Sequence, residues 1–339
     1  MYTFGGCFKF NSKRQVRECT NQVLVYDTIE GRQSILKTKG INILPRKDHH
    51  AAIFGQSMIV YGGTFENGQY TNEMLNFDLE YNDWGRIYYK QNIDPFVQGA
   101  CCSVMLSRKQ STMPGSEMTR LSDAVLDGIY FFGGKNQKGE LQTKLKYLKP
   151  HCIDGKVMSV EWQKIKQGGV PPCGRVGHAM SFLQANQALL VVGGRNDEVC
   201  KSLSTPFLND IHLFLLDQKA WVSVKYTPFS QRLFRLGNHT MCTMTDGDSY
   251  EKTIIFGGIT HSKIGGKQQT GRVGGRGSVK APGKGLKSPS GLKSPTSGGA
   301  SHIRSKFGEE AEHGEDGAHH QESSHLSNDL YILEVRQIM

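Results

Sequence analysis

Short apolar runs along the chain end repeatedly in a pair of glycines. The clearest run is Leu189–Val192, which leads directly into two glycines and then into polar and charged residues. The second glycine of each pair stands at 6, 63, 134, 194 or 258, so the pairs recur every 57 to 71 residues. Such spacing indicates a repeat array built from small sheets. The five pairs are Gly5 and Gly6, Gly62 and Gly63, Gly133 and Gly134, Gly193 and Gly194, and Gly257 and Gly258.

Three further patterns accompany the glycine pairs and predict the other strands of each unit. An arginine and a histidine precede a strand of small residues, as in RVGHAMSFL at 175–183. Downstream of the glycines an asparagine precedes an aromatic or apolar residue by five positions, and a tryptophan then opens a short strand. These residues are Arg46, Arg175 and Arg235, then Asn21, Asn72, Asn209 and Asn328, and finally Trp84, Trp162 and Trp221.

We name the four predicted strands of a unit a, b, c and d. Strand a follows the arginine, strand b ends in the glycine pair, strand c follows the asparagine and strand d starts at the tryptophan. Short strands joined by polar turns predict an antiparallel sheet. Because strand b is apolar on both faces, each sheet should lie between two like sheets, as radial stacking allows. Units 1 to 5 are predicted at 1–36, 46–90, 98–166, 175–225 and 235–335.

The recurring residues have different expected roles. Strand b must leave the crowded centre through a sharp turn, where glycine adopts a positive φ at little cost. Each tryptophan is expected to be a packing residue that buries on the order of 200 Å² of its surface against the sheet of the next unit. The arginines recur at one position of the repeat, which favours anchoring of the blades, with contact to a partner as the alternative.

Together these residues resemble the kelch repeat. The marks of that family are a glycine pair after an apolar strand, an aromatic–Asp dipeptide such as Phe77–Asp78, and a tryptophan about 20–28 residues past the glycines. The resemblance covers 1–261 and 326–339. It implies an all-β fold: a kelch-type β-propeller of about five four-stranded antiparallel blades, or an incomplete set of six, used mostly as a protein-binding platform.

Some units depart from the pattern. Unit 3 lacks the arginine–histidine lead and carries a polar insert near 107–124. Unit 1 begins at strand b and has no tryptophan, and unit 5 ends after strand c. The missing strands a and d belong to different blades. This favours an incomplete gene product or an open ring, with a five-bladed ring with imperfect ends as the alternative.

A long insert, 262–325, separates strands b and c of unit 5. Ten Lys and Arg residues and no acid lie in 262–306, and six acids lie in 309–322. With almost no apolar side chains, this basic-then-acidic segment is expected to be disordered. Ser288 and Ser294 each precede a proline and are candidates for phosphorylation, which would reduce the positive charge. A solvated linker is the plain interpretation, and docking on an acidic polymer such as a cytoskeletal filament is the alternative.

Composition narrows the function classes. The net charge of +10 comes partly from the insert, and interleaved aromatics for nucleic-acid binding are missing there. No apolar run approaches the ~20 residues of a membrane span. Eight scattered cysteines without a C-x-x-C motif favour a reducing compartment, so we predict a cytoplasmic location. No metal, cofactor or catalytic motif is expected, and a propeller enzyme stays an alternative that stoichiometric copper or iron would favour.

Binding is expected at one face of the propeller, where the b–c loops and the d–a connections meet. Arginine and lysine side chains there should form a mildly basic rim that takes an acidic or mixed-charge segment of a partner protein. Arg46, Arg175 and Arg235 would contribute to this rim if they contact partners. The candidate partner-binding residues are Lys135, Arg195, Asp197, Arg232 and Lys263.

Overall fold

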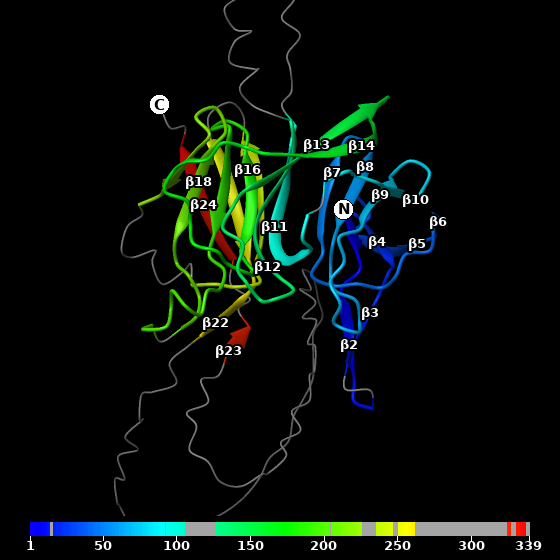
Figure 1. Cartoon of the computed structure of the whole chain (residues 1–339), viewed down its shortest axis with the longest axis horizontal. Coiled ribbons are helices and arrows are strands. Elements are labelled where there is room, and N and C mark those ends of the chain that lie inside the picture. Colours follow the sequence, from blue (N-terminus) through cyan, green and yellow to red (C-terminus); the bar gives the residue numbers. More distant parts are fainter. Residues whose placement is uncertain are drawn as a thin grey trace, which may run out of the picture. The chain divides into compact units, whose positions relative to one another are not determined.

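The computed structural model describes residues 1–13, 16–91, 93–105, 127–203, 205–225, 235–246, 250–261, 324–326 and 330–336. All regular secondary structure in these ranges is β-strand, which confirms the predicted all-β class (Figure 1). Within the same ranges, no helix could serve as a membrane span. The predicted insert lies outside the described residues except at 324–325, and so do Arg232, Lys263, Ser288 and Ser294.

Units 2 and 4 form antiparallel sheets in the predicted order a, b, c, d, each with one additional short strand parallel to strand d. Unit 2 contains β7 (His50–Phe54), β8 (Ser57–Tyr61), β9 (Met74–Asp78) and β10 (Asp83–Ile87), flanked by β6 (Lys39–Gly40). Unit 4 contains β16 (Ala179–Leu183), β17 (Ala188–Val192), β18 (Ile211–Leu215) and β19 (Ala220–Ser223), flanked by β15 (Gly168–Gly169). The two flanking strands were not predicted because they carry no apolar side chain.

The other three units follow the same order with the expected gaps. Unit 3 has four strands, whereas unit 1 has only strands b, c and d and unit 5 only strands a, b and c. Unit 3 contains β11 (Phe96–Val104), β12 (Gly128–Asn136), β13 (Lys146–Ile153) and β14 (Lys156–Gln163). Unit 1 contains β1 (Tyr2–Phe4), β4 (Val23–Asp27) and β5 (Arg32–Leu36), and unit 5 contains β20 (Thr240–Asp246), β21 (Tyr250–Phe256) and β24 (Leu330–Arg336).

Two hairpins in the b–c segments were not predicted. In unit 1, β2 (Cys7–Asn11) pairs with β3 (Val16–Cys19). In unit 5, β22 (Ile259–His261) pairs with β23 (Ser324–Leu326). The last two residues of the predicted insert, 324 and 325, therefore belong to a strand. In each hairpin the first strand directly follows the glycine pair of its unit, and the second strand precedes strand c.

Trp162 does not open strand d of unit 3, as the sequence pattern predicted, but lies next to the end of β14. Asp154 and Gly155 have φ angles of 50° and 78° and form the turn of a longer β13–β14 hairpin. This extension lies on unit 2, where Gln56 N–H donates to the carbonyl of Gly155 at 2.8 Å. The tight turn therefore starts strand d six residues before the tryptophan.

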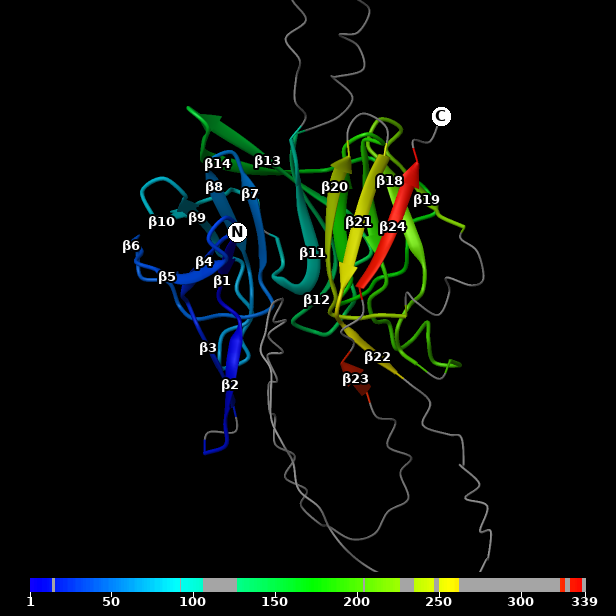
Figure 2. The ribbon, with the colours of Figure 1, turned by 180° about the vertical axis from the view of Figure 1, so that it is seen from behind.

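From unit 2 to unit 5, strand a of each unit contacts strand a of the following unit. The contacts run from β7 to β11, from β11 to β16 and from β16 to β20 (Figures 1 and 2). Behind these strands, four apolar clusters fill the spaces between successive sheets, and each cluster combines residues of two units. All five residues of β8 and of β17 are buried, as the two-faced apolar pattern of strand b predicted.

The tryptophans pack against the preceding unit rather than the next one. Their rings lie on the aromatic residue that directly precedes the glycine pair of that unit: the centroid distance is 4.8 Å from Trp84 to Phe4 and 5.0 Å from Trp221 to Phe132. Strand residues alternate between the two faces of a sheet, and the face that carries the tryptophan is the one turned to the preceding sheet. The corresponding distance from Trp162 to Tyr61 is 5.2 Å.

The glycine pairs form turns that only glycine accommodates readily. All ten residues have φ angles between 60° and 105°. A Cβ atom on Gly133 would lie 2.6 Å from the carbonyl oxygen of Arg175 in the next unit. A Cβ atom on Gly63 would lie 3.0 Å from the carbonyl oxygen of Lys47 in its own unit. The turns thus combine a left-handed backbone with close approach of a second chain segment.

A chain of backbone hydrogen bonds links units 2 to 5 just before strand a or, in unit 3, near the start of strand a. Gln98 N–H donates to Asp48 O at 3.2 Å, Gly177 N–H to Gln98 O at 2.9 Å, and Asn238 N–H to Gly177 O at 2.7 Å. The four residues share φ angles of 57° to 62°, three of them without being glycine. Such a conformation costs free energy at a non-glycine residue, and the hydrogen bonds between units offset that cost.

Candidate functional site

In units 2 to 5, the first residue after the glycine pair occupies the same place in its unit. Thr64 pairs with Lys47, Arg195 with Val176 and Ile259 with Gly237, each through an isolated antiparallel bridge. In unit 3 the corresponding residue, Lys135, pairs with Val97. Backbone pairing to the segment before strand a therefore fixes the position from which each of these side chains starts.

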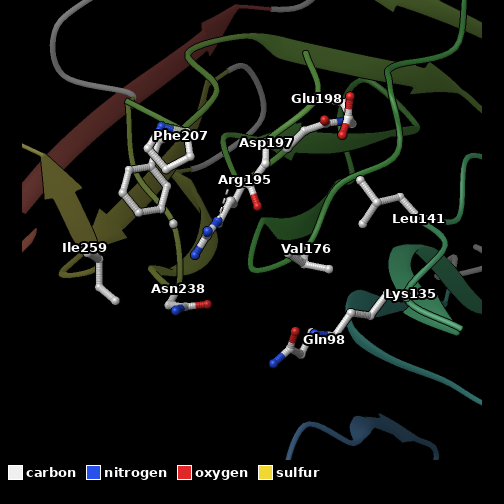
Figure 3. Close-up of a pocket in the computed structure, with 14 residues that line it drawn as sticks. Gln98, Lys135, Leu141, Val176, Arg195, Asp197, Glu198, Phe207, Asn238 and Ile259 are labelled. Carbon is white, nitrogen blue, oxygen red and sulfur yellow. Dashed lines mark hydrogen bonds and ion pairs between the residues drawn. The ribbon is translucent and has the colours of Figure 1, made fainter. Parts of the chain in front are cut away.

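A concave pocket of about 840 Å³ is lined by the residues that follow the glycine pairs of units 3, 4 and 5 (Figure 3). Gln98 and Asn238, from the chain of backbone hydrogen bonds between units, also line it. Figure 3 shows Arg195 and Asn238 on one side and Lys135 and Gln98 on the other. The lining combines cations, carboxylates, amides and apolar side chains. Its residues are Gln98, Lys135, Gly139, Leu141, Val176, Arg195, Asn196, Asp197, Glu198, Pro206, Phe207, Gly237, Asn238 and Ile259.

Three of the candidate partner-binding residues, Lys135, Arg195 and Asp197, line this one pocket. Arg195 Nε donates to Asp197 Oδ1 at 2.8 Å, and the two side chains are 53% and 63% exposed. An ion pair this exposed is weak, on the order of 0–1 kcal/mol, so a ligand can compete for either partner. Because the bond uses Nε, the terminal amino groups of the guanidinium can reach a ligand.

Two asparagines hold the loops that carry the charged residues. Asn196 is buried, and its Nδ2 donates to Gly174 O at 2.6 Å while its Oδ1 accepts from Val199 N–H at 2.9 Å. Asn136 Oδ1 accepts from the backbone N–H of Lys138 at 3.0 Å and of Glu140 at 2.9 Å. Each asparagine directly follows a pocket cation, so Lys135 and Arg195 stand on ordered loops.

Arg46 and Arg175 do not belong to the basic rim that the sequence suggested, because both are fully buried. Arg46 Nη1 donates to Gly62 O at 3.1 Å and its Nη2 to Glu73 at 2.6 Å. Arg175 Nη1 donates to Gly193 O at 2.9 Å. Each arginine thus joins the carbonyl of its own glycine pair to an acid at the start of strand c.

The acids that pair with these arginines, Glu73 and Asp210, were not predicted from the sequence. Each directly follows the repeat asparagine, Asn72 or Asn209, and that position was the available signal. Burial alone would raise the pKa of Asp210, but hydrogen bonds from Arg175 and His212 outweigh burial and hold that pKa well below its usual range.

Arg235 lies one residue before the place that Arg46 and Arg175 occupy. The carbonyls of Arg46, Arg175 and Leu236 accept equivalent 2.8 Å hydrogen bonds from the second glycine of the preceding pair. Leu236 therefore takes the repeat position in unit 5. Arg235 instead donates from Nη1 to the carbonyl of Phe207 at 3.1 Å, next to the wall of the pocket.

Histidines occupy equivalent positions at the start of strand a in units 2, 4 and 5. Desolvation lowers the pKa of His49 and of His239 to about 4, and it lowers the pKa of His178 well below its ordinary value. These rings are therefore neutral packing groups at pH 7. No cluster of three or more His, Cys, Asp or Glu residues that could hold a metal occurs in the ranges that the structure describes.

The chain is similar in sequence to parts of several longer proteins. Acyl-CoA-binding domain-containing protein 4 of Arabidopsis thaliana is 25% identical over 261 residues, which are 74% of this chain and 32% of that protein. Host cell factor 1 of Homo sapiens is 25% identical over 231 residues, 65% of this chain and 10% of that protein. The chain spans about a third or less of the length of the curated relatives it matches first.

A solved structure and a family model also support a β-propeller fold. The solved structure titled "Structure of YjhT" has a TM-score of 0.51 and 14% identity, and the match covers 76% of this chain and 73% of that one. The likeness supports the fold. A family model described as Attractin/LZTR1 beta-propeller matches residues 1–272. The chain is a kelch-type β-propeller, as its repeats indicated, and it belongs to the Attractin/LZTR1 beta-propeller family.

Proposed function

We propose that this protein is a non-catalytic interaction module that binds an acidic or mixed-charge segment of a partner protein in the pocket of units 3 to 5. Propellers of this family are typically protein-interaction modules. The observation that carries the proposal is the placement of Lys135 and Arg195 at equivalent positions of adjacent units, both lining one pocket.

The chemistry of the pocket suits a peptide with a carboxylate. A guanidinium and an ammonium group from separate units can hold one carboxylate, or two that are adjacent in sequence. Leu141, Val176 and Ile259, which are partly exposed, supply apolar surface for a neighbouring side chain. Asp197 and Glu198 would accept a basic residue elsewhere in a mixed-charge ligand.

The pocket lining favours binding over catalysis. Its fourteen residues include no histidine, cysteine, serine or threonine, so the lining offers no hydroxyl or thiol nucleophile paired with a histidine base. The location in a reducing compartment and the role as a scaffold stay predictions that follow from the cysteine pattern and the family.

Binding of a labelled peptide tests the proposal. The probe is a fluorescein-labelled decapeptide of alternating Glu and Gly, measured by fluorescence anisotropy with the full-length protein. The double variant Lys135→Ala/Arg195→Ala should weaken binding at least about tenfold, since each charge-assisted hydrogen bond contributes about 1.5–3 kcal/mol. Lys138→Ala is the matched control, because Lys138 is exposed in the same loop and does not line the pocket. Equal affinities for the wild type and the double variant would overturn the proposal.

Docking on an acidic polymer is a second candidate function, favoured by the ten Lys and Arg residues without an acid in 262–306. The long-range attraction of such a segment would depend strongly on salt. Co-sedimentation with actin filaments or microtubules that is lost on deletion of 262–306 would support it. Sedimentation that the deletion leaves unchanged would exclude it.

A further inference from the structure

Two cysteines face each other at the base of the β2–β3 hairpin of unit 1. Cys7 opens β2 and Cys19 closes β3, and the two residues are direct partners in the antiparallel register. Their Sγ atoms lie 3.3 Å apart. Among the described residues, which include all eight cysteines, this is the one hydrogen bond between two thiols.

The hairpin geometry needs little change for a bond between these sulfurs. A disulfide has an S–S length of about 2.05 Å, so the Sγ atoms must approach by a little over ~1 Å. The register shifts between Cys7 and Lys9, and an irregularity at that point lets the strand adjust without breaking the pairing on either side.

We propose that Cys7 and Cys19 form a reversible disulfide that fixes the base of this hairpin. The oxidant is a low-molecular-weight disulfide of the glutathione class. The thiolate of Cys7 attacks one sulfur of oxidised glutathione, and one glutathione leaves as its thiol. The thiolate of Cys19 then attacks Cys7 Sγ and expels the second glutathione. One disulfide is reduced to two thiols while the two cysteines lose two hydrogens, so atoms and electrons balance.

Exposure decides the order of the two steps. Cys7 is half-buried and can meet the oxidant, whereas Cys19 is buried. Burial, together with the hydrogen bond to Cys7, raises the pKa of the Cys19 thiol to about 12, which makes it a poor first nucleophile. Cys19 therefore acts second, when its nearness to the mixed disulfide at Cys7 compensates for its small thiolate fraction.

The disulfide would act on the loop face of the propeller. The backbone N–H of Cys19 donates to Glu66 Oε1 at 3.1 Å, and Glu66 lies in the b–c loop of unit 2. The hairpin is itself the b–c segment of unit 1. Oxidation would thus restrict a loop on the same face of the repeat that carries Lys135 and Arg195, and reduction would release it.

Peptide mapping of the full-length protein tests this inference. The protein is equilibrated with mixtures of reduced and oxidised glutathione, alkylated and digested with trypsin. Trypsin cleaves between the two cysteines, so oxidation should link the peptides Met1–Lys9 and Glu18–Arg32, each with one cysteine, and the link should disappear with dithiothreitol. Half-oxidation should need at least about tenfold less oxidised glutathione than half-modification of the exposed Cys152.

Two variants serve as controls. Cys7→Ser should abolish the linked peptide, and Cys152→Ser should leave it unchanged. Circular dichroism establishes that both variants are folded. The inference is overturned if wild-type Cys7 and Cys19 are both alkylated, or if Cys7 only accumulates glutathione, under conditions that modify Cys152 completely.

Discussion

The guanidinium of Arg175 binds the carboxylate of Asp210 through two hydrogen bonds, of 2.6 and 2.8 Å. The arginine is fully buried, and it also donates to the carbonyl of Gly193. One side chain therefore connects the turn after strand b to the start of strand c. Arg46 makes the same connection in unit 2, through Gly62 and Glu73.

Breaking the Arg175–Asp210 pair should destabilise the fold. Asp210→Asn leaves a buried guanidinium without its countercharge and should lower the free energy of unfolding by about 2–4 kcal/mol. This value lies toward the low end for a buried pair because the Asp210 side chain is 32% exposed. Urea unfolding measures the loss. Asp197→Asn, which removes an exposed pair, should cost less than about 1 kcal/mol, and equal costs at the two positions would refute this assignment.

Stability should fall in mild acid because buried histidines are held neutral. An unfolded histidine has a pKa near 6.5, whereas burial lowers the pKa of His49 and His239 to about 4. The contribution is complete above pH 6.5 and is lost as the pH falls toward 4, at up to about 1.4 kcal/mol per pH unit for each histidine.

Urea midpoints at pH 7.5, 6.0 and 5.0 measure this slope. His239→Gln should flatten it, and His151→Gln should not, because His151 is exposed. Midpoints that stay constant from pH 7.5 to 5.0 in the wild type would show that these rings are not held neutral.

Two glycines allow the energetic cost of steric contact to be distinguished from that of the backbone conformation. Gly133 and Gly139 have φ angles of 67° and 84°, but a Cβ atom meets Arg175 O at 2.6 Å only at Gly133 and has nothing within 4 Å at Gly139. Gly139→Ala should cost about 1 kcal/mol for the backbone alone, and Gly133→Ala should cost at least about 2 kcal/mol more. Thermal unfolding compares the two, and similar melting temperatures would contradict close packing at the glycine pairs.

The order of strands within a unit could be predicted because apolar periodicity and glycine pairs are local signals. Strand b, for example, is apolar at each of its positions in β17, which only a strand covered on both faces explains. The b–c loop position of Arg195 followed directly from that pattern.

Other features depend on contacts distant in sequence and could not be predicted in the same way. The one-residue shift of Arg235 has a local signal, because Arg235 precedes His239 by four residues whereas Arg46 and Arg175 precede their histidines by three. Its structural meaning, however, depends on the hydrogen bond from Gly194 to Leu236 O. The burial of Arg46 depends on Glu73, an acid 27 residues away that is marked in the sequence only by its place after Asn72. Recurrence identified the arginines as structural, but only the fold shows that they are removed from the binding face.

Measuring the charge preference of the pocket tests most directly whether Lys135 and Arg195 form the binding site. Isothermal titration calorimetry compares the wild type with Lys135→Glu/Arg195→Glu, using the alternating Glu–Gly decapeptide and its Lys–Gly counterpart. We expect the wild type to bind the acidic peptide better and the variant to prefer the basic one, because the pocket then lacks its two cations. If both proteins bind the two peptides with the same order of affinity, these two residues do not form the binding site.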